Sequence, residues 1–149
     1  MKLKKLAALL CALMLCLAGM AAMGEDMTMN EGEKNMQMMI GETPVTVAWE
    51  DNASVEALRA LAAEGITIEM SMYGGFEQVG SIGQSLPRDD AQTTTTSGDI
   101  VLYSGNQMVV FYGSNSWAYT RLGHITDQTP EQMKALLGNE DVTITLSMK

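Results

Sequence analysis

Apolar and polar residues alternate along much of the chain beyond residue 35. Successive side chains of a strand point to opposite faces, so this period of two predicts short strands with one buried face. The segments that show it best are 36–40, 45–49, 66–72 and 142–146. Two unbroken apolar runs, 100–103 and 108–112, flank a turn-like segment and predict a hairpin. With a further segment at 120–125, the pattern predicts seven or eight short strands.

Two segments show helical spacing instead. Asn52 can cap the first helix, because its side-chain oxygen accepts from a free amide of the first turn, and Gly65 suits the helix end. Thr129, Pro130 and Gln132 form the capping-box pattern that starts a second helix. Many short strands with two short helices predict a mainly β fold. We expect a closed or nearly closed barrel whose helices cover its open ends or one face.

The chain from Tyr73 to Gly98 has no clear period and is predicted to be irregular. It contains the polar segment 88–97, with four consecutive threonines, and a second loop is expected at 113–119. Long irregular stretches inside a compact domain often carry function. A functional site is therefore expected where these loops meet.

The first residues have the three parts of a secretory signal. Three lysines at positions 2, 4 and 5 precede an uncharged stretch over 6–23, and small residues at Ala22 and Gly24 suit a signal peptidase. The sequence predicts a signal peptide at 1–24, a flexible polar leader at 25–35 and one folded domain at 36–149. The alternative is an uncleaved membrane anchor, for which the uncharged stretch is near the lower length limit.

Signal cleavage would change the charge and cysteine counts. It would leave 6 basic and 18 acidic residues, a formal net charge of −12. This excess argues against nucleic acid, whose phosphates need basic partners, and against anionic membrane surfaces. Cys11 and Cys16 both lie in the predicted signal. The secreted chain would then have no disulfide, catalytic thiol or cysteine-based zinc site, and we predict no cofactor.

Five motifs occur in an order that resembles the bacterial cyclophilin-like fold domains, over roughly residues 36–148. They are Tyr73-Gly74-Gly75-Phe76-Glu77, Gln84-Ser85-Leu86-Pro87, Gly98-Asp99-Ile100-Val101-Leu102-Tyr103, Val110-Phe111-Tyr112-Gly113 and Tyr119-Thr120-Arg121-Leu122-Gly123-His124-Ile125. The resemblance implies a closed eight-stranded barrel capped by two short helices. Likeness to the true cyclophilins, which are proline isomerases, is weaker, and no catalytic residue carries over by motif.

The candidate site gathers aromatic residues from the irregular segments and the hairpin around one cation. Its predicted members are Tyr73, Phe76, Gln84, Leu86, Phe111, Tyr119 and Arg121. Aromatic rings beside an arginine suit a small apolar or peptidic ligand that carries a carbonyl or carboxylate. In the structural interpretation of the same residues, Phe111 is core, Tyr73 and Phe76 plug one end of the barrel, and Arg121 pairs with an acid.

Two other functions remain open from the sequence. A proline isomerase could use Arg121 as a donor to the prolyl nitrogen above an apolar pocket. A structural or interaction domain could use the loop at 93–96 and the acidic surface as its contact. His124 is the single histidine and has no serine elbow beside it, so a hydrolase is not expected.

No metal site is predicted, although two weak candidates exist. Asp89, Asp90 and Asp99 offer hard oxygen ligands for calcium, but their spacing matches no known calcium loop. Methionines in and near the leader offer thioethers for cuprous copper, although Met36 and Met38 have the alternation of core residues.

Expressed in a secreting bacterial host, the exported product should begin at Glu25, or at Ala22 if cleavage follows the small residue at position 21. N-terminal sequencing of the product measures this. Replacing Leu9 with Arg should block export, because a charge interrupts the apolar stretch. An exported product that retains Met1 would contradict the prediction.

Overall fold

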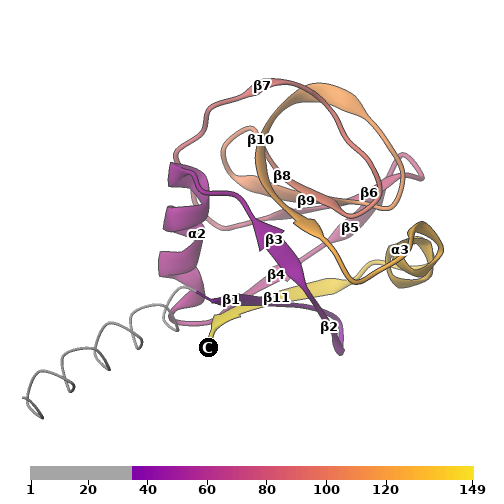
Figure 1. Ribbon diagram of the computed structural model, residues 1–149, viewed down its shortest axis with the longest axis horizontal. Helices are drawn as coiled ribbons and strands as arrows, with labels where there is room; N and C mark the ends of the chain where they lie inside the picture. Colours follow the sequence, from indigo (N-terminus) through magenta and orange to yellow (C-terminus); the bar gives the residue numbers. More distant parts are fainter. Residues whose placement is uncertain (1–34) are drawn as a thin grey trace, which may run out of the picture. The chain divides into compact units, whose positions relative to one another are not determined.

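The computed structural model describes residues 35–149 (Figure 1). The predicted signal peptide and all but the last residue of the predicted leader lie outside the described residues. The elements are β1 (Met36–Ile40), β2 (Thr43–Val45), β3 (Val47–Trp49), α2 (Ala53–Ala62), β4 (Ile66–Glu69), β5 (Ser71–Tyr73), β6 (Glu77–Ser81), β7 (Ala91–Thr94), β8 (Asp99–Tyr103), β9 (Gln107–Phe111), β10 (Ser116–Ile125), α3 (Pro130–Leu137) and β11 (Thr143–Met148). The prediction of a mainly β fold with two helices is confirmed.

The strands form two sheets, and neither is closed. A 4-stranded sheet has the order β2-β1-β11-β4, and a 7-stranded sheet has the order β3-β10-β8-β9-β6-β5, with β7 paired to β10. All the strand pairs in both sheets are antiparallel. The prediction of a closed eight-stranded barrel is therefore corrected to two open sheets.

The physical reason is that two of the predicted strands break in the middle. The segment 45–49 breaks at Thr46, whose N–H donates to the Asp127 carboxylate at 3.0 Å instead of to a strand. The segment 66–72 breaks at Met70, between β4 and β5. At each break the chain leaves the smaller sheet and enters the larger one, since β2 pairs with β1 while β3 pairs with β10, and β4 pairs with β11 while β5 pairs with β6.

Both predicted helix starts are confirmed. The Asn52 side chain accepts from the Val55 N–H at 2.9 Å, and Thr129 and Gln132 form a reciprocal capping box. Val55 and Leu58 of α2 are fully buried, so the apolar stripe of this helix faces the core. The caps satisfy amides that the helices leave free at their first turns.

The larger sheet is covered on both faces, which accounts for the unbroken apolar runs of the hairpin. Ile100 and Leu102 of β8 face the main core, whereas Val101 of the same strand faces a second, smaller cluster. This outer cluster consists of Val101, Val109, Phe111 and Tyr119, with Phe76, Val79 and Tyr103 packed against it. Strands with two buried faces have little polar surface, and their sequences lose the alternation of half-exposed strands.

Two strands were missed in the segments that the sequence predicted to be irregular. β6 and β7 lie between Tyr73 and Gly98, and β10 begins at Ser116 rather than at Thr120. The pattern in β6 was hidden because its first two residues, Glu77 and Gln78, are both polar and both buried. Burial depends on the partners of a strand, which the local sequence does not contain.

Gln78 joins the larger sheet to the connection between α3 and β11. Its side chain is fully buried, and its amide nitrogen donates to the carbonyl oxygens of Leu137 at 2.8 Å and Glu140 at 2.7 Å. Its amide oxygen accepts from the Val142 N–H at 3.1 Å. One side chain therefore satisfies three buried or partly buried backbone groups just before β11 enters the smaller sheet.

Replacing Gln78 with Ala should lower the free energy of unfolding by about 3 kcal/mol or more, because three backbone groups lose their partner in a dry environment. Urea denaturation of the full chain measures this. Gln37, which is exposed on β1, provides the control, and Gln37→Ala should change stability by less than about 0.5 kcal/mol. Equal effects of the two changes would contradict the structural role of Gln78.

Candidate functional site

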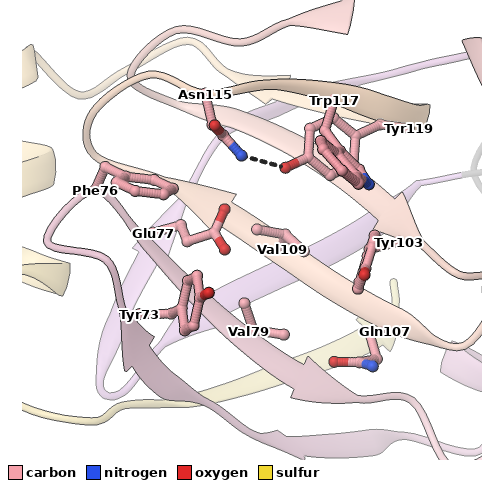
Figure 2. Close-up of a pocket in the computed structure, with 10 residues that line it drawn as sticks. All are labelled: Tyr73, Phe76, Glu77, Val79, Tyr103, Gln107, Val109, Asn115, Trp117 and Tyr119. Atoms are coloured by element: carbon pink, nitrogen blue, oxygen red, sulfur yellow. Dashed lines mark hydrogen bonds between the residues drawn. The ribbon is translucent and has the colours of Figure 1, made fainter. Parts of the chain in front are cut away.

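A cavity of about 550 Å³ lies on the outer face of the larger sheet, over the outer cluster (Figure 2). Residues of β5, β6, β8, β9 and β10, and of the turns beside them, line it. They are Tyr73, Phe76, Glu77, Val79, Tyr103, Gln107, Val109, Asn115, Trp117 and Tyr119. The lining is mostly aromatic and aliphatic, with one carboxyl group and two amides, the mixture typical of small-molecule sites.

Strand alternation decides which side chains reach this cavity. Glu77 and Val79 lie on the outer face of β6, while Gln78 between them faces the inner side and the α3–β11 connection. In the same way Val109 of β9 faces the cavity, and its neighbours Met108 and Val110 lie in the main core. The cavity floor is thus built on strands that the core holds from behind.

Glu77 is the unusual member of the cavity. It is only 5% exposed, and its Oε2 is buried without a hydrogen-bond partner among residues 35–149. Figure 2 shows its carboxyl group in the middle of the lining residues. Burial disfavours the charged form and raises the pKa of Glu77 to about 7. A carboxyl group in this state changes its charge near neutral pH and has an unused acceptor.

Aromatic rings form the walls around Glu77. Tyr73 and Phe76 meet edge to face with their centroids 6.3 Å apart, and Tyr103 and Tyr119 meet at 6.2 Å. Asn115 donates its amide to the Tyr119 hydroxyl at 2.9 Å. Burial, with a smaller effect of the nearby Glu77 charge, raises the pKa of Tyr119, so this phenol stays neutral near pH 7.

Two of the wall residues are largely open to solvent. Tyr73 is 65% exposed and Trp117 is 57% exposed, which makes them the two most exposed large hydrophobic residues of the described chain. Tyr73 packs edge to face on Phe76, but most of its surface, like that of Trp117, faces solvent at the rim of the cavity. Their position suits contact with a ligand.

The structure brings together three of the seven predicted site residues. Tyr73, Phe76 and Tyr119 line the cavity, and Phe111 lies fully buried beneath it, with its ring 5.8 Å from that of Tyr119. Gln84 is exposed elsewhere, and Leu86 belongs to the main core.

Arg121 lies away from the aromatic cavity. It lines a second cavity of about 360 Å³, whose walls come from the start of α2, the segment 87–93 and β10. Its guanidinium lies 3.3 Å from the Asp99 carboxylate, which also contacts the His124 ring nitrogen Nδ1 at 2.8 Å. Arg121 therefore pairs with an acid, as the structural interpretation of its sequence context proposed.

No group of three or more side chains suited to a metal ion occurs among residues 35–149. Asp90 contacts Arg88 and Thr120, and Asp99 contacts Arg121 and His124. Met36 and Met38 are buried in the main core, and the leader methionines lie outside the described residues. Within the same residues, neither helix has the length and apolar character needed to cross a membrane.

Comparison with known proteins agrees with this architecture. The pattern of the cyclophilin-like family matches residues 38–147. The chain belongs to the cyclophilin-like family. No curated protein matches the chain. A similar solved structure is the solution structure of the hypothetical protein AF2241 from Archaeoglobus fulgidus, with a TM-score of 0.51 and 13% identity over 76% of this chain and 93% of that one. At this identity the likeness supports the cyclophilin-like fold alone.

Seven of the residues that line the cavity of this cyclophilin-like domain were not predicted from the sequence. They are Glu77, Val79, Tyr103, Gln107, Val109, Asn115 and Trp117. One signal was available for Glu77, which directly follows the Tyr73-Gly74-Gly75-Phe76 motif and stands two residues before Val79. Residues two apart on a strand lie on the same face of the sheet. An acid two positions before an apolar residue therefore indicates a carboxyl group on an apolar face.

Glu77 should make the domain less stable as the pH rises. The pKa of this carboxyl is about 7 in the folded chain, against about 4.5 for the usual value, so the folded state holds the proton more tightly. The free energy of unfolding should therefore fall between about pH 4.5 and pH 7, by about 3 kcal/mol in all, with the loss complete above pH 7.

Glu77→Gln should remove this pH dependence and raise the free energy of unfolding by about 1–3 kcal/mol at pH 8, with little change at pH 4.5. Urea denaturation at both pH values provides the measurement. Glu42→Gln, at an exposed turn, is the matched control and should change stability little at either pH. A variant of Glu77 that is less stable than the natural chain at pH 8 would show that its charge has a partner.

Proposed function

We propose that this chain is an exported cyclophilin-like domain that binds a small molecule or a short peptide segment in the aromatic cavity. The observation that carries the proposal is a buried carboxyl oxygen without a hydrogen-bond partner, on Glu77, inside a cavity walled by aromatic rings. The signal pattern at residues 1–24 supports the export part of the proposal.

The size and lining of the cavity support binding. Its volume of about 550 Å³ lies within the range of about 300–1,000 Å³ typical of small-ligand sites. Buried polar groups are almost always hydrogen-bonded, so an unpartnered oxygen at such a place needs a reason. A stability cost at a single site is commonly retained where that site binds a ligand.

The two alternative functions receive less support from the site. A proline isomerase of the kind considered from the sequence needs a cation above an apolar pocket, but Arg121 lines a different cavity and pairs with Asp99. An interaction domain would use the segment 93–96, but Thr93 and Thr94 belong to β7 and pair with β10, and Thr95 is buried. Neither alternative function gives a role to the buried, unpartnered oxygen of Glu77.

Binding is tested with the isotopically labelled full chain and a fragment panel of small aromatic compounds, alkylamines, carboxylates and short proline peptides. Ligands that enter the cavity should shift the NMR signal of the Trp117 indole N–H. The indole of Trp49, which donates to the Met36 carbonyl oxygen at 2.9 Å, should not respond and serves as the internal reference.

Val79→Trp should abolish these shifts, because the larger side chain fills the cavity from its floor. Asp89→Ala, in the wall of the second cavity, is the control and should leave them unchanged. If no compound of the panel shifts the Trp117 signal, or if the shifts persist in Val79→Trp, the aromatic cavity is not the binding site.

A further inference from the structure

We propose that the aromatic cavity selects ligands that carry an alkylammonium group, and that Glu77 and the rings around it recognise the positive charge. This inference rests on the proposed function, because it names the chemical class of ligand for the same cavity. It goes beyond that function because it assigns a positive charge to the ligand and names the residues that recognise this charge.

The first argument is the unsatisfied carboxyl group. Glu77 is nine-tenths or more buried, its Oε2 has no partner, and the group points into the cavity (Figure 2). A buried carboxylate is costly unless it is paired with a cation or hydrogen-bonded. A positively charged group in the cavity would be the ionic partner of this carboxylate, and an ammonium that carries an N–H would also donate a hydrogen bond to Oε2. An anionic ligand would add a second negative charge to the same enclosed space.

The second argument is the kind of wall. Five aromatic residues line the cavity: Tyr73, Phe76, Tyr103, Trp117 and Tyr119. The faces of such rings carry partial negative charge and attract ammonium groups, by about 0.5–2 kcal/mol for each favourable contact. Aromatic rings around a carboxylate thus attract a cation in two ways, whereas a neutral apolar ligand would use the rings alone.

The third argument is that no competing cation reaches Glu77. The residues that line the cavity include no Lys, Arg or His, and none of the salt bridges in the described part of the chain involves Glu77. The whole chain also has a formal net charge of −9. An acidic protein with an unpaired carboxyl in a low-dielectric cavity raises the local concentration of cations.

Three probes of nearly equal shape separate charge from size. Choline and 3,3-dimethylbutan-1-ol have the same shape and differ only in a charged nitrogen or a neutral carbon at the branch point. In 3,3-dimethylbutanoate the neutral branched group is kept and a negative charge is carried at the other end. Their affinities for the full chain are measured at pH 8 from the Trp117 indole signal, with Trp49 as the reference. We expect choline to bind about tenfold more tightly than the alcohol, and the carboxylate to bind more weakly than both.

Glu77→Gln should reduce this preference to about threefold or less, because the rings and the shape of the cavity are kept while the charge of the carboxylate is lost. Tyr73→Leu is the second variant. Tyr73 is largely exposed, so the fold does not depend on it. Its replacement should weaken choline by about threefold and leave the alcohol nearly unchanged, because an apolar surface remains but the ring face is gone.

The choline affinity should also fall with pH. The titratable groups that line the cavity are Glu77 and the phenols of Tyr73, Tyr103 and Tyr119. Burial raises the pKa of Glu77 to about 7 and raises the pKa of Tyr119 above its ordinary value, so Glu77 changes charge near neutrality and Tyr119 does not. Choline should bind about tenfold more weakly at pH 5.5 than at pH 8, and the alcohol should bind equally at both.

The outcomes separate this inference from the proposed function. Equal binding of choline and the alcohol, or tighter binding of the carboxylate, would overturn the charge preference while leaving the cavity as a binding site. Failure of choline and of every alkylamine in the panel, with other fragments still binding, would also overturn it. If choline binds as expected, a peptide with trimethyllysine is compared with its norleucine analogue to distinguish a peptide side chain from a free amine.

Discussion

The position of the two polar side chains at the start of β6 organises both the fold and the site. Gln78 faces inward and satisfies three backbone groups of Leu137, Glu140 and Val142, which ties the larger sheet to the chain as it enters the smaller one. Glu77 faces outward and is left with a buried oxygen that has no partner. A buried amide whose hydrogen bonds are all made stabilises one arrangement of the chain. A buried carboxyl group that lacks a hydrogen bond lowers the stability of the fold, and a ligand could supply the missing bond. Because the residues are adjacent on one strand, the network that anchors β6 also fixes where the carboxyl group lies.

The second constraint is the burial of the central hairpin on both faces. The main core holds β8 and β9 from the inside, and the outer cluster covers them from the outside. The cavity is built on this outer cluster and not on loops alone, so its floor consists of strands that the core supports from behind. The rim is different, since Tyr73 and Trp117 are more than half exposed to solvent. The cavity thus has a floor supported by the core, the carboxyl group of Glu77 at its centre, and exposed aromatic rings at its rim. This arrangement suits selection of a ligand by both shape and charge.

The sequence predicted part of this site, for reasons that can be named. Tyr73, Phe76 and Tyr119 were found because aromatic residues in irregular, glycine-rich segments have no strand or helix pattern to explain them. Glu77 was missed because an acid beside a glutamine looks like exposed surface until its neighbours are known. Arg121 was included because one cation among aromatic residues looked like a ligand contact. In the structure the pairing of β10 with β8 shifts register between Arg121 and Gly123, and the Arg121 side chain pairs with Asp99.

The sequence by itself determined the local features: both helix caps, the alternating strands, the hairpin at 100–112 and the membership of a mainly β class. Each of these depends on interactions between residues a few positions apart, such as Asn52 with Val55 or Thr129 with Gln132. Only the tertiary structure decided that two strands break at Thr46 and Met70, that the strands form two open sheets, and that Glu77 is buried without a partner. These features depend on residues far apart in the chain, because pairing and burial are properties of surfaces that exist only once the sheets have formed.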